Sequence, residues 1–309
     1  MLIRTNKSVF FALSFFGFSV LSFSQTAIPY YAPDPTTLMG ARSSGRAHST
    51  VASELEHDSL LQNPASSVFK SQYAVSLEYG IVGDSLAASI VDTQSGPVGG
   101  GIYYSRRDFE GVDLSLLDSS YGNFERIEEQ AGFALMGKFS EQFGIGATIK
   151  WSYIKSLEND VPNGRAWTFD LGSRIKVNNT IAIGILGQNL LKDNRGLIPR
   201  KLSAGAEFTP VIGLDLSAEV NSVESRTITG LFELPNQSQT IGWALGTQYR
   251  FAQGATIRAG YQESPAWNQS AFTLGAGFQN KSFSADYAYQ KSLEGNKGTT
   301  HMVGFTGYF

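Results

Sequence analysis

The stretch Thr300-His301-Met302-Val303-Gly304-Phe305-Thr306-Gly307-Tyr308-Phe309 alternates apolar residues with small or polar ones. Successive side chains of a β-strand point to opposite faces, so Val303, Phe305 and Phe309 share one face. The other face carries Met302, Gly304, Thr306 and Tyr308. The alternation therefore predicts a strand with one apolar face that needs an apolar surrounding.

A strand of this pattern with a final aromatic residue resembles the last strand of bacterial outer-membrane β-barrel proteins. In that class the barrel assembly machinery reads the terminal strand, so the resemblance implies Phe309 as the assembly signal and this machinery as a partner. Gly307 departs from the usual pattern, which has a larger residue there. The resemblance also implies the bacterial outer membrane as the location, and its lipids as the surrounding of the apolar face.

The first 24 residues are predicted to be a secretory signal peptide. Arg4 and Lys7 precede an apolar run over 9–21, and the small residues Ser22 and Ser24 follow it. This order of charged, apolar and small residues is typical of a signal peptide. A membrane-spanning helix is the alternative, but the run is shorter than the roughly 20 residues that a span needs. The mature chain is expected to begin at residue 25.

Composition excludes several functional classes. The chain has no cysteine, which rules out a lipid anchor on cysteine, disulfides and thiolate metal sites. The formal net charge of -3 gives no basic surface for nucleic acid. Beyond the signal peptide no apolar run is long enough for a membrane helix. A chain that spans a membrane without such helices must close its strands into a barrel.

An alternating pattern of period 2 recurs from residue 71 onward and predicts about 14 strands. The count is 12 if the two weakest segments, 86–91 and 98–104, are not strands. The connections alternate between long and short, as expected when one barrel end is extracellular and the other periplasmic. A soluble β-sandwich is the alternative, but it would not alternate its loops in this way. The predicted strands are 73–79, 86–91, 98–104, 130–138, 143–153, 167–171, 181–188, 201–208, 214–220, 241–251, 255–261, 272–279, 283–290 and 300–309.

Charged residues occupy the face opposite to the apolar one. A charge on the lipid face near the membrane centre would cost about 2–4 kcal/mol, so these residues are predicted to point inward. They either pair across the lumen and hold the barrel or act as a charge filter. The residues are Glu78, Lys138, Lys150, Asp170, Arg174, Lys201, Glu207, Asp215, Glu219, Arg250, Arg258 and Asp286.

The segment 25–70 does not alternate and contains Gly40-Ala41-Arg42 and, just before the first strand, Asn63-Pro64-Ala65. These motifs, with the later stretches 183–190 and 197–206, resemble the FadL-type outer-membrane transporters. The resemblance implies a 14-stranded barrel over 71–309 with residues 25–70 folded into the lumen as a plug. Asn63, Pro64 and Ala65 then either form a rigid turn or belong to a gate for a ligand.

Three consecutive glycines, Gly99, Gly100 and Gly101, lie in the third predicted strand. Glycine in a strand often marks a bulge or a close approach. In the FadL-type family the third strand kinks and opens a lateral route to the bilayer, so the resemblance implies this role for the three glycines. A bend of the barrel or a close contact with the plug is the alternative.

The longest predicted loop covers 106–126 and is rich in apolar residues. An exposed apolar loop suggests a surface that captures a ligand or binds a protein partner, although it could also fold down and cap the barrel. The capture residues are Phe109, Leu114, Leu116, Leu117, Tyr121 and Phe124.

The sequence does not indicate an enzyme. Gly83-Asp84-Ser85-Leu86 matches the short motif of a hydrolase family, but the acid and base expected near the C-terminus are missing, since Gly298 stands where Asp would precede His301. The three histidines lie far apart, without metal-ligand spacing. No cofactor or metal is expected.

Two classes of function follow from the resemblance. The first is a channel for passive uptake of hydrophobic, fatty-acid-like molecules through a plugged barrel with a lateral exit. The second is a barrel without transport that serves as an outer-membrane partner in secretion, surface attachment or envelope organisation.

Overall fold

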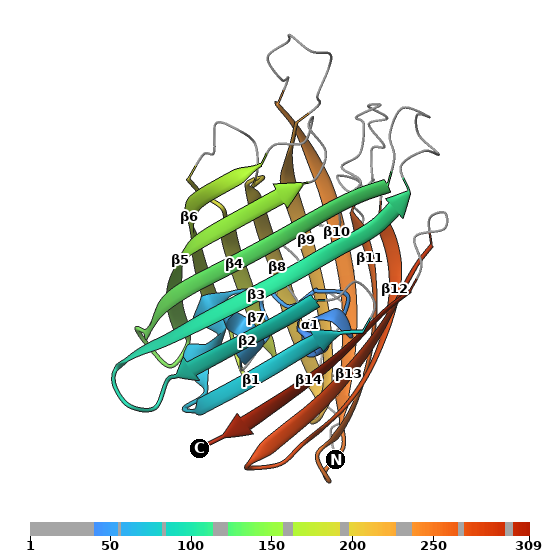
Figure 1. Ribbon diagram of the computed structural model, residues 1–309. Coiled ribbons are helices and arrows are strands. Elements are labelled where there is room, and N and C mark those ends of the chain that lie inside the picture. The colour runs from blue at the N-terminus through green and yellow to red at the C-terminus, as the bar shows by residue number, and fades with distance from the viewer. Residues whose placement is uncertain are drawn as a thin grey trace, which may run out of the picture.

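Fourteen antiparallel strands form one closed barrel in the computed structural model (Figure 1). The structure describes residues 40–54, 57–81, 85–113, 123–156, 163–191, 198–226, 237–264, 269–293 and 299–309. Each strand pairs with its neighbours in sequence, and β1 pairs with β14 to close the wall. The predicted count of 14 is confirmed and the alternative of 12 is wrong. The predicted signal peptide lies outside the described residues.

The strands of the wall differ in length: β1, β2 and β7 have 8 residues each, and β3 and β4 have 16 each. The strands are β1 (Tyr73–Gly80), β2 (Ser85–Asp92), β3 (Val98–Asp113), β4 (Asn123–Lys138), β5 (Phe143–Ser156), β6 (Gly164–Lys176), β7 (Ile181–Gln188), β8 (Lys201–Val211), β9 (Leu214–Arg226), β10 (Gln237–Arg250), β11 (Ala255–Ser264), β12 (Gln269–Gln279), β13 (Phe283–Ser292) and β14 (Thr299–Tyr308). The helices are α1 (Ala41–Ser44) and the 3₁₀ helices η1 (His57–Leu60) and η2 (Pro64–Phe69).

The wall extends further than the sequence predicts. β3 runs to Asp113 and β4 begins at Asn123, so the predicted loop 106–126 is wrong over most of its length. The apolar alternation fades there because polar pairs replace it: Arg106 lies 3.5 Å from Glu129 across the two strands. β9 and β10 extend in the same way into the predicted loop 221–240.

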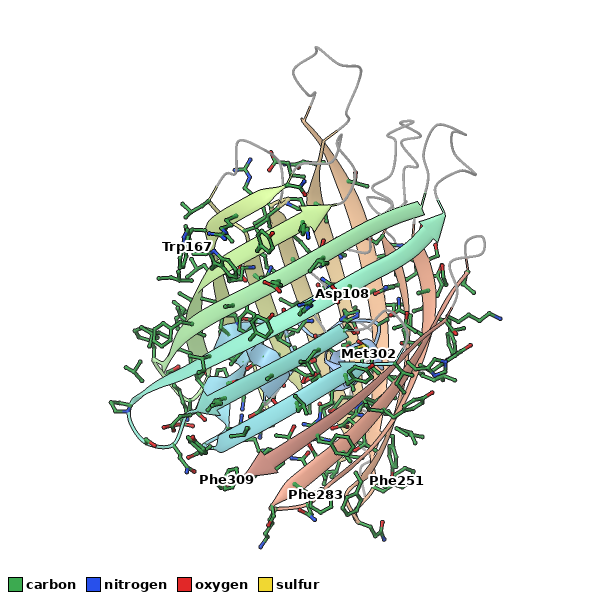
Figure 2. The ribbon with its side chains drawn as sticks, in the orientation of Figure 1. Asp108, Trp167, Phe251, Phe283, Met302 and Phe309 are labelled. Atoms are coloured by element: carbon green, nitrogen blue, oxygen red, sulfur yellow. The ribbon has the colours of Figure 1, made fainter. Side chains whose placement is uncertain are left out.

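The outer surface of the barrel is apolar. On β1 the predicted faces are confirmed: Val75, Leu77 and Tyr79 are exposed, while Ser76 and Glu78 are buried. Phe251, Phe283 and Phe309 lie outward near the rim that carries the C-terminus, and Trp167 lies toward the other rim (Figure 2). Aromatic residues at two levels of an apolar exterior are typical of barrels in a bilayer. No helix among the described residues is long and apolar enough to cross a membrane.

Residues 40–54 and 57–70, here called the inner segment, lie inside the barrel (Figure 1). η2 packs against β4, β5 and β6, α1 packs against β12, β13 and β14, and η1 packs against β1, β2 and β3. Ala41, Leu60 and Leu61 form one buried apolar cluster with wall residues such as Val91 and Met136. The inner segment therefore fills the lumen beside the shorter strands.

Candidate functional site

The Asn63-Pro64-Ala65 motif fastens the inner segment to the wall. Asn63 is fully buried and caps η2, with its Oδ1 accepting from the Ala65 N–H at 3.1 Å. Its Nδ2 donates to the Val51 carbonyl at 2.7 Å and to the Ser173 carbonyl of β6 at 3.1 Å. Pro64 suits the first helical position because its fixed φ matches the helix and no N–H is needed there. These bonds tie the start of η2 both to the rest of the inner segment and to β6.

Glycine in the wall allows this junction to lie close to the strands. A Cβ on Gly146 of β5 would lie 2.6 Å from the carbonyl carbon of Pro64, closer than real contacts allow. A side chain at this position would push the start of η2 away from β5. The lack of a side chain at Gly146 therefore allows Pro64 to contact β5 directly.

Acidic side chains of the wall bind backbone N–H groups of the inner segment. Glu219 of β9 accepts from Thr50 and Val51, both at 3.2 Å. Glu78 of β1 accepts from Ala41 at 3.0 Å. A buried carboxylate is tolerated only where such donors replace water. The two glutamates thus hold two separate turns of the backbone.

Two arginines of the inner segment enter buried ion pairs with the wall. Arg42 Nε lies 2.9 Å from Asp286 Oδ2, and Arg258 of β11 reaches Oδ1 of the same carboxylate at 2.8 Å. Arg46 lies 2.8 Å from Glu207 of β8. Burial lowers the pKa of Arg42, but the negative charges of Asp286, Tyr308 and Asp58 together outweigh this effect and raise that pKa well above its usual value. Arg42 is therefore charged at every relevant pH.

Five of the inward charges of the wall bind the inner segment: Glu78, Arg174, Glu207, Glu219 and Asp286. Arg174 of β6 also binds the inner segment, since its Nε donates to the Ala52 carbonyl at 2.6 Å. Lys150 and Asp170 instead pair with each other at 2.8 Å. Lys138 and Arg250 are exposed because they lie at the ends of β4 and β10, and Arg250 still lies 3.0 Å from the buried Asp215.

The glycines of the third strand lie in an unbroken part of the wall. Gly100 and Gly101 pair with Asp92 and Val91 of β2, and the ladder to β4 runs from Val98 to Phe109 without a register shift. The shift in β3 occurs later, between Phe109 and Val112. The pairing register is thus unbroken at the glycines.

Gly101 and Gly100 have different surroundings. A Cβ on Gly101 would lie 2.7 Å from Leu60 Cδ1, whereas a Cβ on Gly100 would have its nearest neighbour at 3.7 Å. Gly101 thus faces the inner segment and Gly100 faces outward. The close contact with the inner segment, given above as the alternative, explains Gly101.

The predicted capture residues lie only partly within the described residues. Phe109 and Phe124 are on β3 and β4, not in a loop, because the hairpin extends beyond them. Leu114, Leu116, Leu117 and Tyr121 lie outside the described residues. The role of these six residues in ligand capture therefore stays a prediction.

The prediction also missed a small cavity in the lumen, on the side of the inner segment that faces the rim with the long strands. It measures about 20 Å³, enough for one water molecule. Arg107 and Glu128, 3.6 Å apart, line one side, and Ile154 and Ile198 line the other. Its residues come from β3, β4, β5 and the segment before β8, so no local sequence signal marks it.

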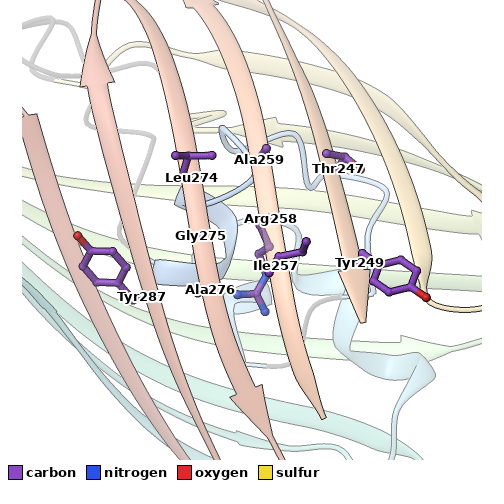
Figure 3. A pocket seen from close by; sticks show the side chains of 9 residues that line it. All are labelled: Thr247, Tyr249, Ile257, Arg258, Ala259, Leu274, Gly275, Ala276 and Tyr287. Carbon is purple, nitrogen blue, oxygen red and sulfur yellow. The ribbon is translucent and has the colours of Figure 1, made fainter. Parts of the chain in front are cut away.

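A larger hollow lies on the outside of the barrel, over β10 to β13 (Figure 3). Its volume is about 450 Å³. Small residues form its floor at Ala259 and Ala276, and Tyr249 and Tyr287 stand at its sides. Because it opens to the lipid-facing surface, it is not part of the lumen.

The motifs considered for catalysis and metal binding lie on different elements. Ser85 and Leu86 begin β2, and residues 83 and 84 lie outside the described residues. His48 belongs to the inner segment and His301 to β14. Among the described residues no group of three metal-ligating side chains occurs.

Comparisons with known proteins identify the fold. No protein-family model matches the chain, and no curated protein matches it. The structure of the CymD monoaromatic hydrocarbon channel matches with a TM-score of 0.65 and 14% identity over 90% of this chain and 99% of that chain. The Pseudomonas putida toluene transporter TodX matches with a TM-score of 0.64 and 13% identity, over 91% and 99%. A Pseudomonas aeruginosa FadL homologue gives 0.63 and 13%, over 91% and 99%.

Proposed function

We propose that this chain is an outer-membrane channel for the passive uptake of hydrophobic small molecules. It has the fold of the FadL-type outer-membrane barrels, as its sequence motifs predict, and its apolar exterior fits a lipid bilayer. The observation that carries the proposal is the inner segment, which is fixed inside a closed barrel of this fold by buried bonds to the wall.

The inner segment also bears on the route of the solute. Its ion pairs and hydrogen bonds would have to break before a solute could pass straight through the lumen. An apolar solute that leaves sideways into the bilayer avoids both this cost and contact with water. A lateral exit therefore belongs to the proposal, and fatty-acid-like or aromatic hydrocarbons are the solutes that suit it.

Uptake by Gram-negative cells tests the proposal. Cells with the barrel should take up radiolabelled toluene or a fluorescent fatty-acid analogue faster than cells without it. Native mass spectrometry of the barrel from outer membranes in mild detergent should show a bound apolar molecule. Equal uptake by the two kinds of cell would contradict the channel.

A barrel that binds a protein partner is the second candidate. The unbroken ladder at the third strand favours it, because the wall shows no opening there. A barrel that is free of apolar ligand but carries a stoichiometric protein partner in the same mass spectrum would support it.

The third strand is the exit that the family resemblance implies, and a pair of variants tests this position. Gly101→Val would press on Leu60, whereas Gly100→Val has room on the outer face. If the solute leaves here, uptake should fall in Gly101→Val and stay near the wild-type rate in Gly100→Val. Unchanged uptake in Gly101→Val would remove the third strand as the exit.

A further inference from the structure

Aromatic side chains cluster on the outer face of β5 and β6, toward the rim opposite the C-terminus. Trp151 and Tyr153 of β5 stack with their ring centroids 6.2 Å apart and an interplanar angle of 9°. Trp151 pairs across the strands with Trp167 of β6, whose side chain is 66% exposed (Figure 2). Alternate residues of one strand and their cross-strand partners share one face of a sheet. The three rings therefore form one exposed surface, here called the aromatic plate.

Two cations border the aromatic plate. Arg165, the cross-strand partner of Tyr153, places its guanidinium carbon 5.7 Å from the centroid of that ring. Lys155 is exposed and lies on the same face of β5, next in the outward series after Tyr153. A guanidinium over a ring still directs its N–H groups sideways, where phosphate oxygens can accept them. The edge of the plate nearest the rim is therefore positively charged.

The acidic side chains of the neighbouring strands have a cation of their own. Glu129 of β4 pairs across the strands with Tyr153, and its carboxylate lies 3.5 Å from Arg106 of β3. Arg106 also lies 3.0 Å from Asp108. No carboxylate of the described residues lies within 4.0 Å of the Lys155 ammonium. The charge of Lys155 is thus not compensated by a described side chain.

The plate and its cations lie at the level of the lipid headgroups on the extracellular side. β5 begins at Phe143, after the short connection 139–142 from β4. Short connections are typical of the periplasmic rim, so β5 runs from the periplasmic side outward. The stretch from Phe143 to Tyr153 has the length of about 9–11 residues with which a tilted strand crosses the apolar core. Lys155 therefore lies just beyond this core.

The periplasmic ends of β5 and β6 present a different outer surface. The outward residues there are Phe143, Ile145, Ser173 and Ile175. The cation beside them, Lys176, turns to the inner segment instead, where its Nζ lies 4.6 Å from the centroid of the Phe69 ring. Within β5 and β6, outward positive charge is thus confined to the extracellular side. An aromatic girdle is common to membrane barrels and explains the rings, but it does not explain this distribution of charge.

We propose that this cluster is a binding site for a phosphorylated glycolipid of the extracellular leaflet. Lys155 and Arg165 bind a phosphate of its headgroup, as cations at a membrane surface bind anionic lipids. The exposed rings of Trp151 and Trp167 contact the C–H face of the sugar and the start of the acyl chains. The site lies on the membrane side of the wall, so it does not depend on which solute the barrel carries.

Native mass spectrometry of the purified barrel in detergent, titrated with lipid A that carries both phosphates, tests the site. Lys155→Gln with Arg165→Gln removes the two cations and should weaken binding at least tenfold. The matched control, Lys138→Gln with Lys281→Gln, removes two exposed cations near the periplasmic rim and should change the affinity less than twofold. Equal affinities of the two double variants for lipid A would overturn the site.

Two further lipids separate the phosphate from the sugar. Lipid A without its phosphates should bind the wild type about as weakly as complete lipid A binds the variant without Lys155 and Arg165. Phosphatidylglycerol has a phosphate but no sugar, and it should bind the wild type at least several-fold more weakly than complete lipid A. Dephosphorylated lipid A that binds as tightly as the complete lipid would overturn the role of the cations. Phosphatidylglycerol that binds equally tightly would overturn the assignment to a glycolipid.

Trp167→Leu tests the sugar contact separately, because it keeps an apolar side chain on the lipid-facing surface but removes the ring. Binding of lipid A should weaken several-fold, while binding of phosphatidylglycerol should stay at the wild-type level. Heat-modifiable mobility on gels verifies that every variant is folded. A folded Trp167→Leu barrel that binds lipid A as tightly as the wild type would contradict the role of the aromatic plate.

Discussion

Asp286 on β13 binds two arginines at once, Arg42 of the inner segment at 2.9 Å and Arg258 of β11 at 2.8 Å. All three side chains are at least nine-tenths buried. One carboxylate therefore links α1 to two strands of the wall. Its loss would leave two buried cations without this partner.

Asp286→Asn should destabilise the barrel by about 3–5 kcal/mol, because breaking a buried ion pair leaves an uncompensated charge. Guanidinium unfolding in detergent measures the change. Glu141→Gln is the matched control: it removes an ion pair with Lys138 in which Glu141 is 90% exposed. The control should change stability by less than about 0.5 kcal/mol. Equal effects of the two variants would contradict the anchoring role of Asp286.

Asn63 should be sensitive to the loss of its donor group rather than its acceptor. Asn63→Asp keeps an oxygen for the Ala65 N–H but places a carboxylate against the carbonyls of Val51 and Ser173. Near neutral pH it should destabilise more than Asn63→Ala, for which we expect a cost of roughly 1–3 kcal/mol. The difference should shrink at low pH, since a protonated carboxyl regains one donor. Thermal unfolding at several pH values measures it, and an Asn63→Asp variant as stable as the wild type would contradict the bonding scheme.

Lys70 should make stability depend on pH in the alkaline range. Burial, and then the charges of Arg42 and Arg250, lower the pKa of Lys70 to about 8. The unfolded chain, with a lysine pKa of about 10.4, binds more protons between these values, so this group adds stability as the pH rises through that range. Below it, the buried charge is a cost.

Lys70→Met removes this dependence. At pH 7 the variant should melt at a higher temperature than the wild type, and the two melting temperatures should converge as the pH approaches 10. Other alkaline titrations affect both proteins alike and cancel in the difference. Melting curves that stay parallel across the range would show that Lys70 titrates normally.

Phe309 should matter for assembly and little for the stability of the finished barrel. Its N–H donates to the Tyr73 carbonyl at 3.0 Å, but its side chain is 77% exposed. Phe309→Ala should slow the appearance of the heat-modifiable folded form in cells, and change unfolding in detergent by less than about 0.5 kcal/mol. Phe139→Ala, at a residue 73% exposed, is the control and should assemble at the wild-type rate. Equal rates for the two variants would argue against Phe309 as the assembly signal.

The sequence predicts the membrane part of the wall well, because lipid outside and polar groups inside impose a strict alternation. It predicts β7 to its last residue, Gln188, and the inward face of β1. It fails beyond the membrane, where Arg106 and Glu129 pair on strands that no longer alternate. Strand structure there depends on cross-strand partners that a local pattern does not contain.

The site is predicted in its parts but not in its connections. The cap that Asn63 makes to Ala65 follows from the local sequence, since asparagine before proline favours such bonds. Its bond to Ser173 does not, because 110 positions separate the two residues. The inward charges are likewise visible in the alternation, while their partners in the inner segment emerge only once the barrel is closed.

The inner segment also constrains the order in which the molecule can be completed. Arg42 can form its ion pair only after Asp286, which lies 244 positions further along the chain, has been placed in β13. Contacts of such long sequence separation form late. A chain halted before β13 leaves Arg42 in water, and a completed chain sequesters it. Trypsin cleavage at Arg42 should thus distinguish an incomplete barrel from a complete one.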